Sequence, residues 1–157
     1  MAVVRVHRCR SGQAMVEFAV VVFAFLFVMF ATMLAAFHSI QRATAETAAA
    51  AGVQVAASGT PGRVDQPDLA GAFAPTRDLL RPVMFSTAIV RVPPGQPCRP
   101  LGGIAPDTLE VCAYPDGELV AETVRGRPNL LVPSFVADRL PLSIDVTVEM
   151  HAVSYQP

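Results

Sequence analysis

A glutamate near the start of a long apolar run, five residues after a glycine, is the pattern in this chain with the clearest chemical meaning. The segment reads RSGQAMVEF from Arg10 to Phe18. The peptide bond after Gly12 is a candidate protease site, because glycine keeps the backbone flexible and has no side chain to obstruct a cleft. Glu17 is a candidate functional carboxylate, because an ionisable group in a membrane span is costly and is retained for a function.

Each of these two residues also has an ordinary interpretation. Gly12 could be only a flexible junction, and an acid such as Glu17 is favoured at the start of a helix by the helix macrodipole. The processing interpretation rests on their combination, since both lie between a basic leader and an apolar span.

The apolar run from Phe18 to Phe37 predicts a single transmembrane helix. It contains no charged residue, and Thr32 is its only polar residue. As a helix rising about 1.5 Å per residue, it is long enough to cross the roughly 30 Å hydrocarbon core of a bilayer. A surface helix of a soluble protein would carry a polar stripe, which this segment lacks.

Charges on the two sides of this run predict its orientation. Arg5, Arg8 and Arg10 precede the run, whereas Arg42 beyond it is soon offset by Glu46. The positive-inside rule therefore predicts a single-pass protein of the cell membrane with a cytoplasmic N-terminus and an extracytoplasmic C-terminal domain. Removal by ordinary signal peptidase fits poorly, because the apolar run exceeds the usual length of about 7–15 residues.

The segment GQAMVEFAVVVFAFLFVMF resembles the start of TadE-like minor pseudopilins, in the tight-adherence (Tad/Flp) branch of type IV pilin-like proteins. In that branch the leader ends in glycine, the fifth mature residue is glutamate, and an aromatic residue often follows. Gly12, Glu17 and Phe18 match these positions, and Gln13 would be the new N-terminus. The resemblance covers roughly residues 8–57. Many family members carry a proline in the span, and its absence here leaves the subgroup open.

The resemblance implies a role in assembly and not an enzymatic one. A prepilin-type peptidase would cut between Gly12 and Gln13, and the new amine of Gln13 would pair with Glu17 of the same or a neighbouring subunit. Other pilins, pseudopilins and the Tad inner-membrane platform would be the partners, in pilus biogenesis, adherence or secretion. A place in the filament, its base or its tip stays open. The alternative is an unprocessed single-pass envelope protein whose exported domain binds a partner or ligand.

The whole chain is expected to have an α+β, membrane-anchored fold. It divides into a basic leader over 1–12, a transmembrane and protruding helix over 13–57, a linker over 58–82 with a helical turn near its end, and a small exported β-rich domain over 83–157. The protruding part of the helix has small residues spaced to form one smooth face, namely Ala45, Ala48, Ala49, Gly52 and Ala56.

The exported domain is expected to form a small antiparallel sheet that packs on this smooth face. Strands are predicted over 83–92, 109–114, 118–124 and 142–154, because these segments are rich in β-branched and aromatic residues. The last one alternates apolar and polar residues with a period of two, so one face should be packed and the other wet.

Cysteine spacing predicts one disulfide, between Cys98 and Cys112 of the exported part, where oxidising conditions permit it. Two unpaired cysteines are the alternative. Cys9 lies in the leader, which explains the odd count of three.

No pattern indicates a metal site, a cofactor or a nucleic-acid surface. The three histidines are dispersed, and no Ser-His-Asp set or phosphate-binding glycine loop stands out. The acids of the exported half alternate with apolar residues, so we interpret them as the wet face and turns of a hairpin. They are Asp107, Glu110, Asp116, Glu118 and Glu122.

Overall fold

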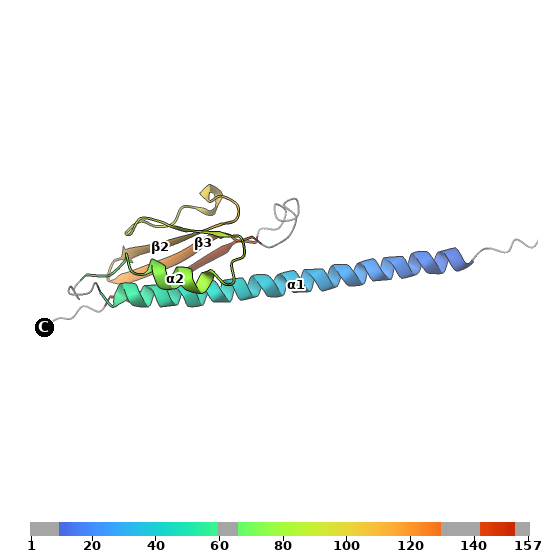
Figure 1. Cartoon of the computed structure of the whole chain (residues 1–157), viewed down its shortest axis with the longest axis horizontal. Helices are drawn as coiled ribbons and strands as arrows, with labels where there is room; N and C mark the ends of the chain where they lie inside the picture. The colour runs from blue at the N-terminus through green and yellow to red at the C-terminus, as the bar shows by residue number, and fades with distance from the viewer. Residues whose placement is uncertain (1–9, 60–65, 130–141, 153–157) are drawn as a thin grey trace, which may run out of the picture. The chain divides into compact units, whose positions relative to one another are not determined.

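The computed structural model describes residues 10–59, 66–129 and 142–152, apart from the side chains of residues 10–12. The chain divides into two compact units, Met1–Ala36 and Phe37–Pro157. Helix α1, Arg10–Ala57, contributes residues to both units and is followed by α2 and a four-stranded sheet (Figure 1). The prediction of an α+β layout is therefore correct.

The first unit contains the apolar part of α1. No proline or glycine interrupts residues 13–36, so the backbone hydrogen bonds can continue without a break. The large side chains of this part are exposed, as in Phe18, Phe23 and Phe27, each above 70 %. With a mean hydropathy of 2.7 in its most apolar window, α1 is the one candidate transmembrane helix in the described part of the chain.

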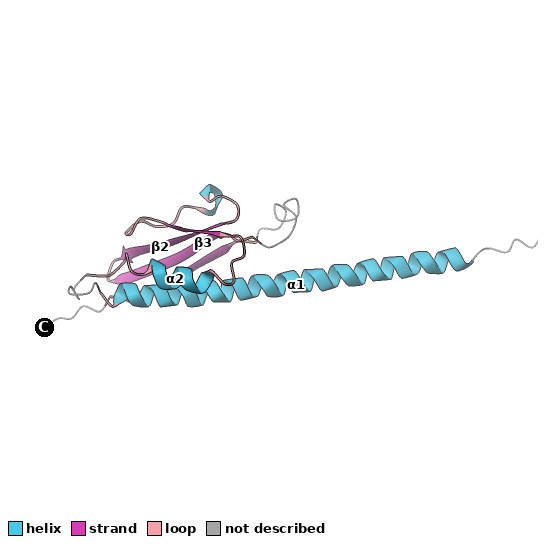
Figure 2. Cartoon of the chain, viewed as in Figure 1, coloured by secondary structure: helices cyan, strands magenta, loops and turns pink. Residues whose placement is uncertain are grey.

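The second unit is built on a mixed sheet with the strand order β1-β2-β3-β4. The strands are β1 Ala88–Arg91, β2 Thr108–Asp116, β3 Leu119–Arg127 and β4 Ile144–His151 (Figure 2). Strands β2, β3 and β4 are antiparallel neighbours, as expected.

Strand β1 contradicts the expectation of a wholly antiparallel sheet, because it pairs with β2 in parallel. The chain between the two strands does not turn directly back. Residues 92–107 cross over and include a 3-10 turn, Leu101–Gly103, so that β2 starts at the same end as β1. Prolines and glycines over 93–95 end β1 but do not specify the return path, which is why the sequence pattern did not reveal the parallel pairing.

The hairpin between β2 and β3 has a two-residue connection. Asp116 pairs with Leu119, and Gly117 between them has a φ of 64°. Glycine adopts positive φ without steric cost, so this position makes the tight turn possible. Pro115 and Asp116, which follow the strand predicted over 109–114, belong to the end of β2.

The core lies between the sheet and the second half of α1. Buried alanines of α1, including Ala45, Ala48 and Ala49, pack against apolar residues of β2, β3 and β4. A second cluster joins Val53 and Ala56 of α1 to the end of the β2–β3 hairpin. The smooth face predicted on the helix is therefore the face that is buried.

Helix α2, Phe73–Leu80, lies in the segment that we expected to be a linker. Its Thr76 and Leu80 are fully buried, and Leu80 belongs to the main core cluster. The segment over 58–82 thus contributes to the core in addition to connecting two elements.

Gly52 allows α1, α2 and β3 to approach closely. A Cβ atom at this position would overlap Oε2 of Glu122 and Oγ1 of Thr76, both of which are buried. Alanine has a higher helix propensity than glycine, so propensity does not explain the glycine at this position. The close packing does.

We predict that Gly52→Ala lowers the free energy of unfolding by about 1–3 kcal/mol, because overpacking a closed core outweighs the better helix propensity of alanine. Thermal unfolding followed by circular dichroism measures this loss. Gly103→Ala is the matched control, since a Cβ there meets no atom within 4 Å. Equal stability of the two variants would contradict the packing role.

Candidate functional site

The expected cleavage bond, between Gly12 and Gln13, lies inside the first turns of α1. The helix begins at Arg10, and no acidic residue occupies its first turn. We expected a flexible peptide at this point, whereas the described backbone is helical. The first amide groups of a helix have no partner within it, so this turn is the one a peptidase could unwind most easily.

Glu17 is placed one helical turn beyond Gln13, and the two side chains interact. Nε2 of Gln13 donates a hydrogen bond to Oε1 of Glu17 over 3.1 Å. Side chains of a helix lean toward its N-terminus, which brings the Glu17 carboxylate back toward residue 13. The residue expected to supply the new amine therefore already contacts the carboxylate expected to pair with it.

The surroundings of this pair are apolar and exposed. Glu17 is the only ionisable residue between Gln13 and Phe37, and the neighbouring Phe18 is 71 % exposed. A carboxylate with this setting would have few polar partners in a membrane or in a bundle of helices.

Beyond the apolar part of α1, Arg42 and Glu46 form an exposed ion pair, with 3.3 Å between Nε and Oε1. The pair belongs to the second unit, on the part of α1 that follows the apolar run.

The second unit contains the expected disulfide between Cys98 and Cys112, whose Cα atoms are 5.5 Å apart. Both cysteines are buried. The bond fastens the crossing segment 92–107 to β2. Cys9 lies outside the described residues.

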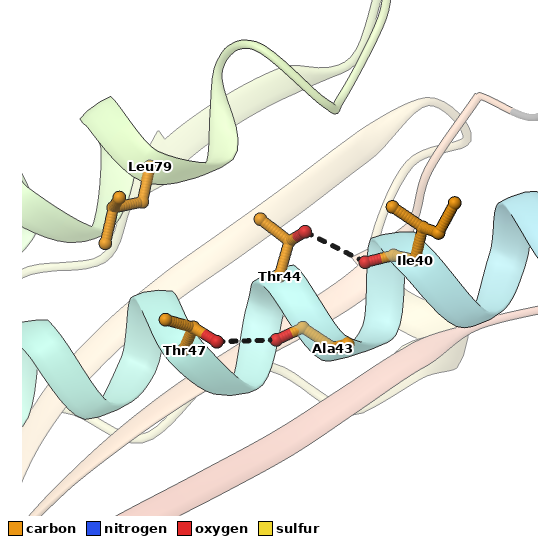
Figure 3. A pocket seen from close by; sticks show the side chains of 5 residues that line it. All are labelled: Ile40, Ala43, Thr44, Thr47 and Leu79. Carbon is orange, nitrogen blue, oxygen red and sulfur yellow. Dashed lines mark hydrogen bonds between the residues drawn. The ribbon is translucent and has the colours of Figure 1, made fainter.

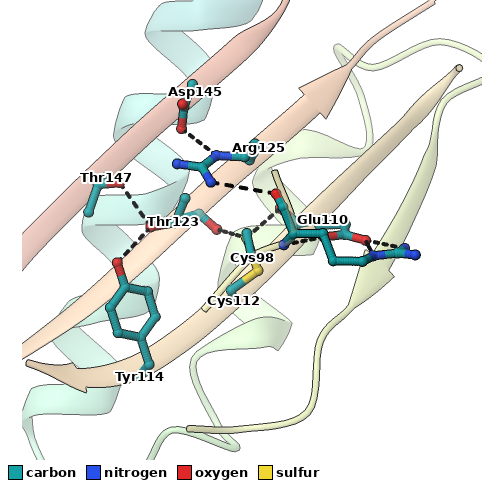
Figure 4. Close-up of polar contacts among 9 residues, drawn as sticks. Cys98, Glu110, Cys112, Tyr114, Thr123, Arg125, Asp145 and Thr147 are labelled. Atoms are coloured by element: carbon teal, nitrogen blue, oxygen red, sulfur yellow. Dashed lines mark hydrogen bonds and ion pairs between the residues drawn. A yellow bond between two sulfur atoms is a disulfide. The ribbon is translucent and has the colours of Figure 1, made fainter. Parts of the chain in front are cut away.

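Glu110 contradicts the expectation that the acids of the exported half are wet, because it is fully buried. It lies on the same face of β2 as Cys112, beneath the crossing segment (Figure 4). The backbone N–H of Arg99 donates to its Oε2 over 3.1 Å, and Nε of Arg99 donates to its Oε1 over 2.6 Å. The segment that the disulfide holds in place thus also supplies the counter-charge.

Hydroxyl groups and a further ion pair continue this polar network across the sheet (Figure 4). Arg125 donates from Nε to Oδ1 of Asp145 over 2.8 Å, and the hydroxyls of Thr123 and Thr147 are 2.9 Å apart. These contacts tie β3 to β4 on the face away from α1.

Glu122 also contradicts the expectation of a wet acid, and it lies on the opposite face, toward α1. It is fully buried, and Oγ1 of Thr76 lies 2.5 Å from its Oε1. Burial raises the pKa of Glu122 from 4.5 to about 7, while the hydrogen bond with Thr76 opposes this rise. The signal was present in the sequence, because the alternation of Val120, Glu122 and Val124 places the glutamate on the apolar face.

Three ligand-type side chains lie close together without forming a metal site. Ligand atoms of Cys98, Glu110 and Cys112 are within 4.8 Å of one another. The two sulfur atoms are bonded to each other, and the side chain of Arg99 donates a hydrogen bond to the carboxylate of Glu110. None of the three is therefore free to bind a metal ion.

A shallow groove of about 300 Å³ lies between α1 and α2 and is lined by Ile40, Ala43, Thr44, Thr47 and Leu79 (Figure 3). Both threonine hydroxyls donate to carbonyl groups of α1 one turn back, over 2.9 and 3.0 Å. None of the lining residues is titratable, so the lining offers no general acid or base to activate the two threonine hydroxyls.

No protein-family model, curated protein or solved structure matches the chain. Its function must therefore be argued from the geometry of its own residues.

We predict that replacing both Cys98 and Cys112 by serine lowers the free energy of unfolding by about 3 kcal/mol, because the loop is no longer closed in the unfolded chain. Thermal unfolding measures the loss. Alkylation of the denatured, unreduced protein followed by mass spectrometry should leave both cysteines unmodified. Labelling of either one would contradict the disulfide.

Proposed function

We propose that the chain is a minor pseudopilin of a Tad-type pilus or secretion system, which acts through assembly of its N-terminal helix. The observation that carries this proposal is the contact between Gln13 and Glu17 at the start of an apolar helical segment in which no residue is buried. A leader ending in Gly12 and a glutamate at the fifth mature position match the processing pattern of that family.

Residues 13–37 of α1 form the membrane anchor in this proposal. Exposed phenylalanines, valines and methionines on all sides of the helix need an apolar environment, which a bilayer supplies and water does not. The basic residues before the span keep the N-terminus in the cytoplasm, and the sheet domain is exported.

Cleavage by a prepilin-type peptidase converts residue 13 into a chain terminus with a positive amine. The carboxylate of Glu17 then lies one turn from a charge of opposite sign, in its own subunit or in a neighbour. In a low-dielectric helix bundle each charge offsets the desolvation of the other, whereas either charge alone is destabilising. The pair thus selects the register in which subunits leave the membrane.

The partners in this proposal are the peptidase, other pilins or pseudopilins and the Tad inner-membrane platform. The second unit, with its disulfide and its polar outer network, is the part available for contacts outside the membrane. The competing function, an uncut envelope anchor, shares the helix and the exported domain but does not need Gly12 or Glu17.

We predict that the mature protein begins at Gln13 and that Gly12→Leu blocks the cut, because a large side chain obstructs the peptidase cleft. Mass spectrometry of the N-terminus and gel migration measure both effects in cells that contain the peptidase. Gly102→Leu is the matched control, since a Cβ there meets no atom within 4 Å. A wild-type chain starting at Met1 or Ala2 would favour the uncut anchor.

We predict that Glu17→Ala leaves membrane insertion intact but lowers assembly at least roughly tenfold, because the amine of Gln13 loses its counter-charge. Surface pili or adherence report assembly, and membrane fractionation reports insertion. Glu17→Gln separates the charge from the hydrogen bond, and Glu46→Ala is a control for an acid exposed elsewhere on α1. Normal piliation by Glu17→Ala would exclude the proposed role.

A further inference from the structure

Three elements of the second unit meet at the hydroxyl group of Thr76. Its Oγ1 lies 3.1 Å from the carbonyl oxygen of Ala48 in α1 and 3.1 Å from that of Ala72 at the start of α2. It lies 2.5 Å from Oε1 of Glu122 in β3. A threonine hydroxyl has a single proton to donate, so it can serve only one of these three oxygen atoms at a time.

The protonation state of Glu122 decides how this proton is used. When Glu122 is neutral, its own O–H donates to Thr76, and the hydroxyl of Thr76 is free to donate to a carbonyl of α1 or α2. When Glu122 is ionised, the hydroxyl of Thr76 must donate to the carboxylate. The carbonyl groups of Ala48 and Ala72 then lose this donor. The neutral form can therefore link all three elements, when Thr76 donates to the carbonyl of Ala48 in α1, whereas the ionised form links only α2 and β3.

The second carboxyl oxygen makes the ionised form more costly. Oε2 of Glu122 is buried without a hydrogen-bond partner among the described residues, and it faces Gly52 of α1. A carbonyl oxygen of a neutral acid tolerates this position far better than a charged oxygen does, because an unpaired buried charge loses its hydration without compensation.

No positive charge among the described residues faces Glu122. Its partners in the sheet are Ala113 on β2 and Val148 on β4, and the buried face of α1 opposite it presents Ala48 and Gly52. The charged groups of the surrounding elements are exposed or lie on the other side of the sheet. They are Arg42 and Glu46 of α1, Arg77 and Asp78 of α2, Glu110 and Asp116 of β2, Arg125 and Arg127 of β3, and Asp145, Glu149 and His151 of β4. The half-buried His38 of α1 lies ten residues before Ala48 along the helix.

We infer that Glu122, Thr76 and Gly52 form a protonation-dependent latch, in which the neutral glutamate closes the seam between α1, α2 and β3 and the ionised glutamate loosens it. This inference concerns residues 37–152 and is independent of the cleavage of the leader. On the proposed function, which exports this unit, the unit takes on the pH of its surroundings, and the latch makes the packing of the sheet on α1 depend on external pH.

The direction of the effect follows from the raised pKa. The folded-state pKa of Glu122, about 7, exceeds its ordinary value of 4.5. The stability of the seam is thus fully present below the ordinary pKa, is lost as pH rises toward the folded-state value, and stays low above it.

Hydrogen exchange of the full-length protein in detergent micelles, compared with Glu122→Gln at each pH, tests the latch. The glutamine mimics the neutral acid and does not titrate, and the ratio of wild type to variant cancels the intrinsic pH dependence of exchange. We predict that opening of α2 and of residues 48–56 rises relative to the variant by roughly 70-fold between about pH 5 and about pH 8. Glu149→Gln, an exposed acid on β4, should behave as wild type.

The same pH dependence in wild type and Glu122→Gln would overturn the inference. If the variant does not fold, the side-chain carboxyl carbons of wild-type glutamates can be titrated by NMR. One glutamate should then titrate near pH 7, because burial raises the pKa of Glu122 to about 7. A set in which every glutamate titrates near its ordinary pKa would equally overturn the inference.

Discussion

Apart from Gln41 and Val53, the residues that the second half of α1 buries are alanines and a glycine. Because these residues are small, the helix axis can approach the strands closely, and the apolar bulk of the core comes from the strands and from α2. The close approach leaves no spare volume at Gly52, where the carboxyl group of Glu122 occupies the space that a Cβ would need. The positions of α2 and β3 therefore both depend on the small side chains that α1 presents on this face.

The first half of the same helix differs in the size and exposure of its side chains. Its side chains are large, apolar and exposed on every side, and burying one such side chain stabilises by about 1.5–3 kcal/mol. One continuous helix thus presents residues suited to two environments. In the proposed function this difference is what allows a subunit to stay in the membrane and later to pack into a helical assembly.

The two buried glutamates show two ways to place an acid in a small domain. Glu110 lies under the crossing segment 92–107, where Arg99 supplies both a backbone and a side-chain donor. Glu122 has only the Thr76 hydroxyl, and burial raises its pKa to about 7. In the first arrangement, the buried carboxylate is paired with a positive charge. In the proposed latch, the second arrangement is sensitive to pH, because no positive charge among the described residues faces Glu122.

Several features followed from the sequence alone, because they depend on neighbours along the chain. The length of the apolar helix, the alternation in β4 and the β2–β3 hairpin are set by local periodicity and turn residues. The pairing of Cys98 with Cys112 was predicted from their place in the exported part. The alternation of Val120, Glu122 and Val124 also placed Glu122 on the apolar face of its strand. The parallel pairing of β1, the burial of α2 and the burial of Glu110 were decided only by the tertiary structure. Each depends on where the crossing segment and α2 return to the sheet, and no local pattern specifies such long-range paths.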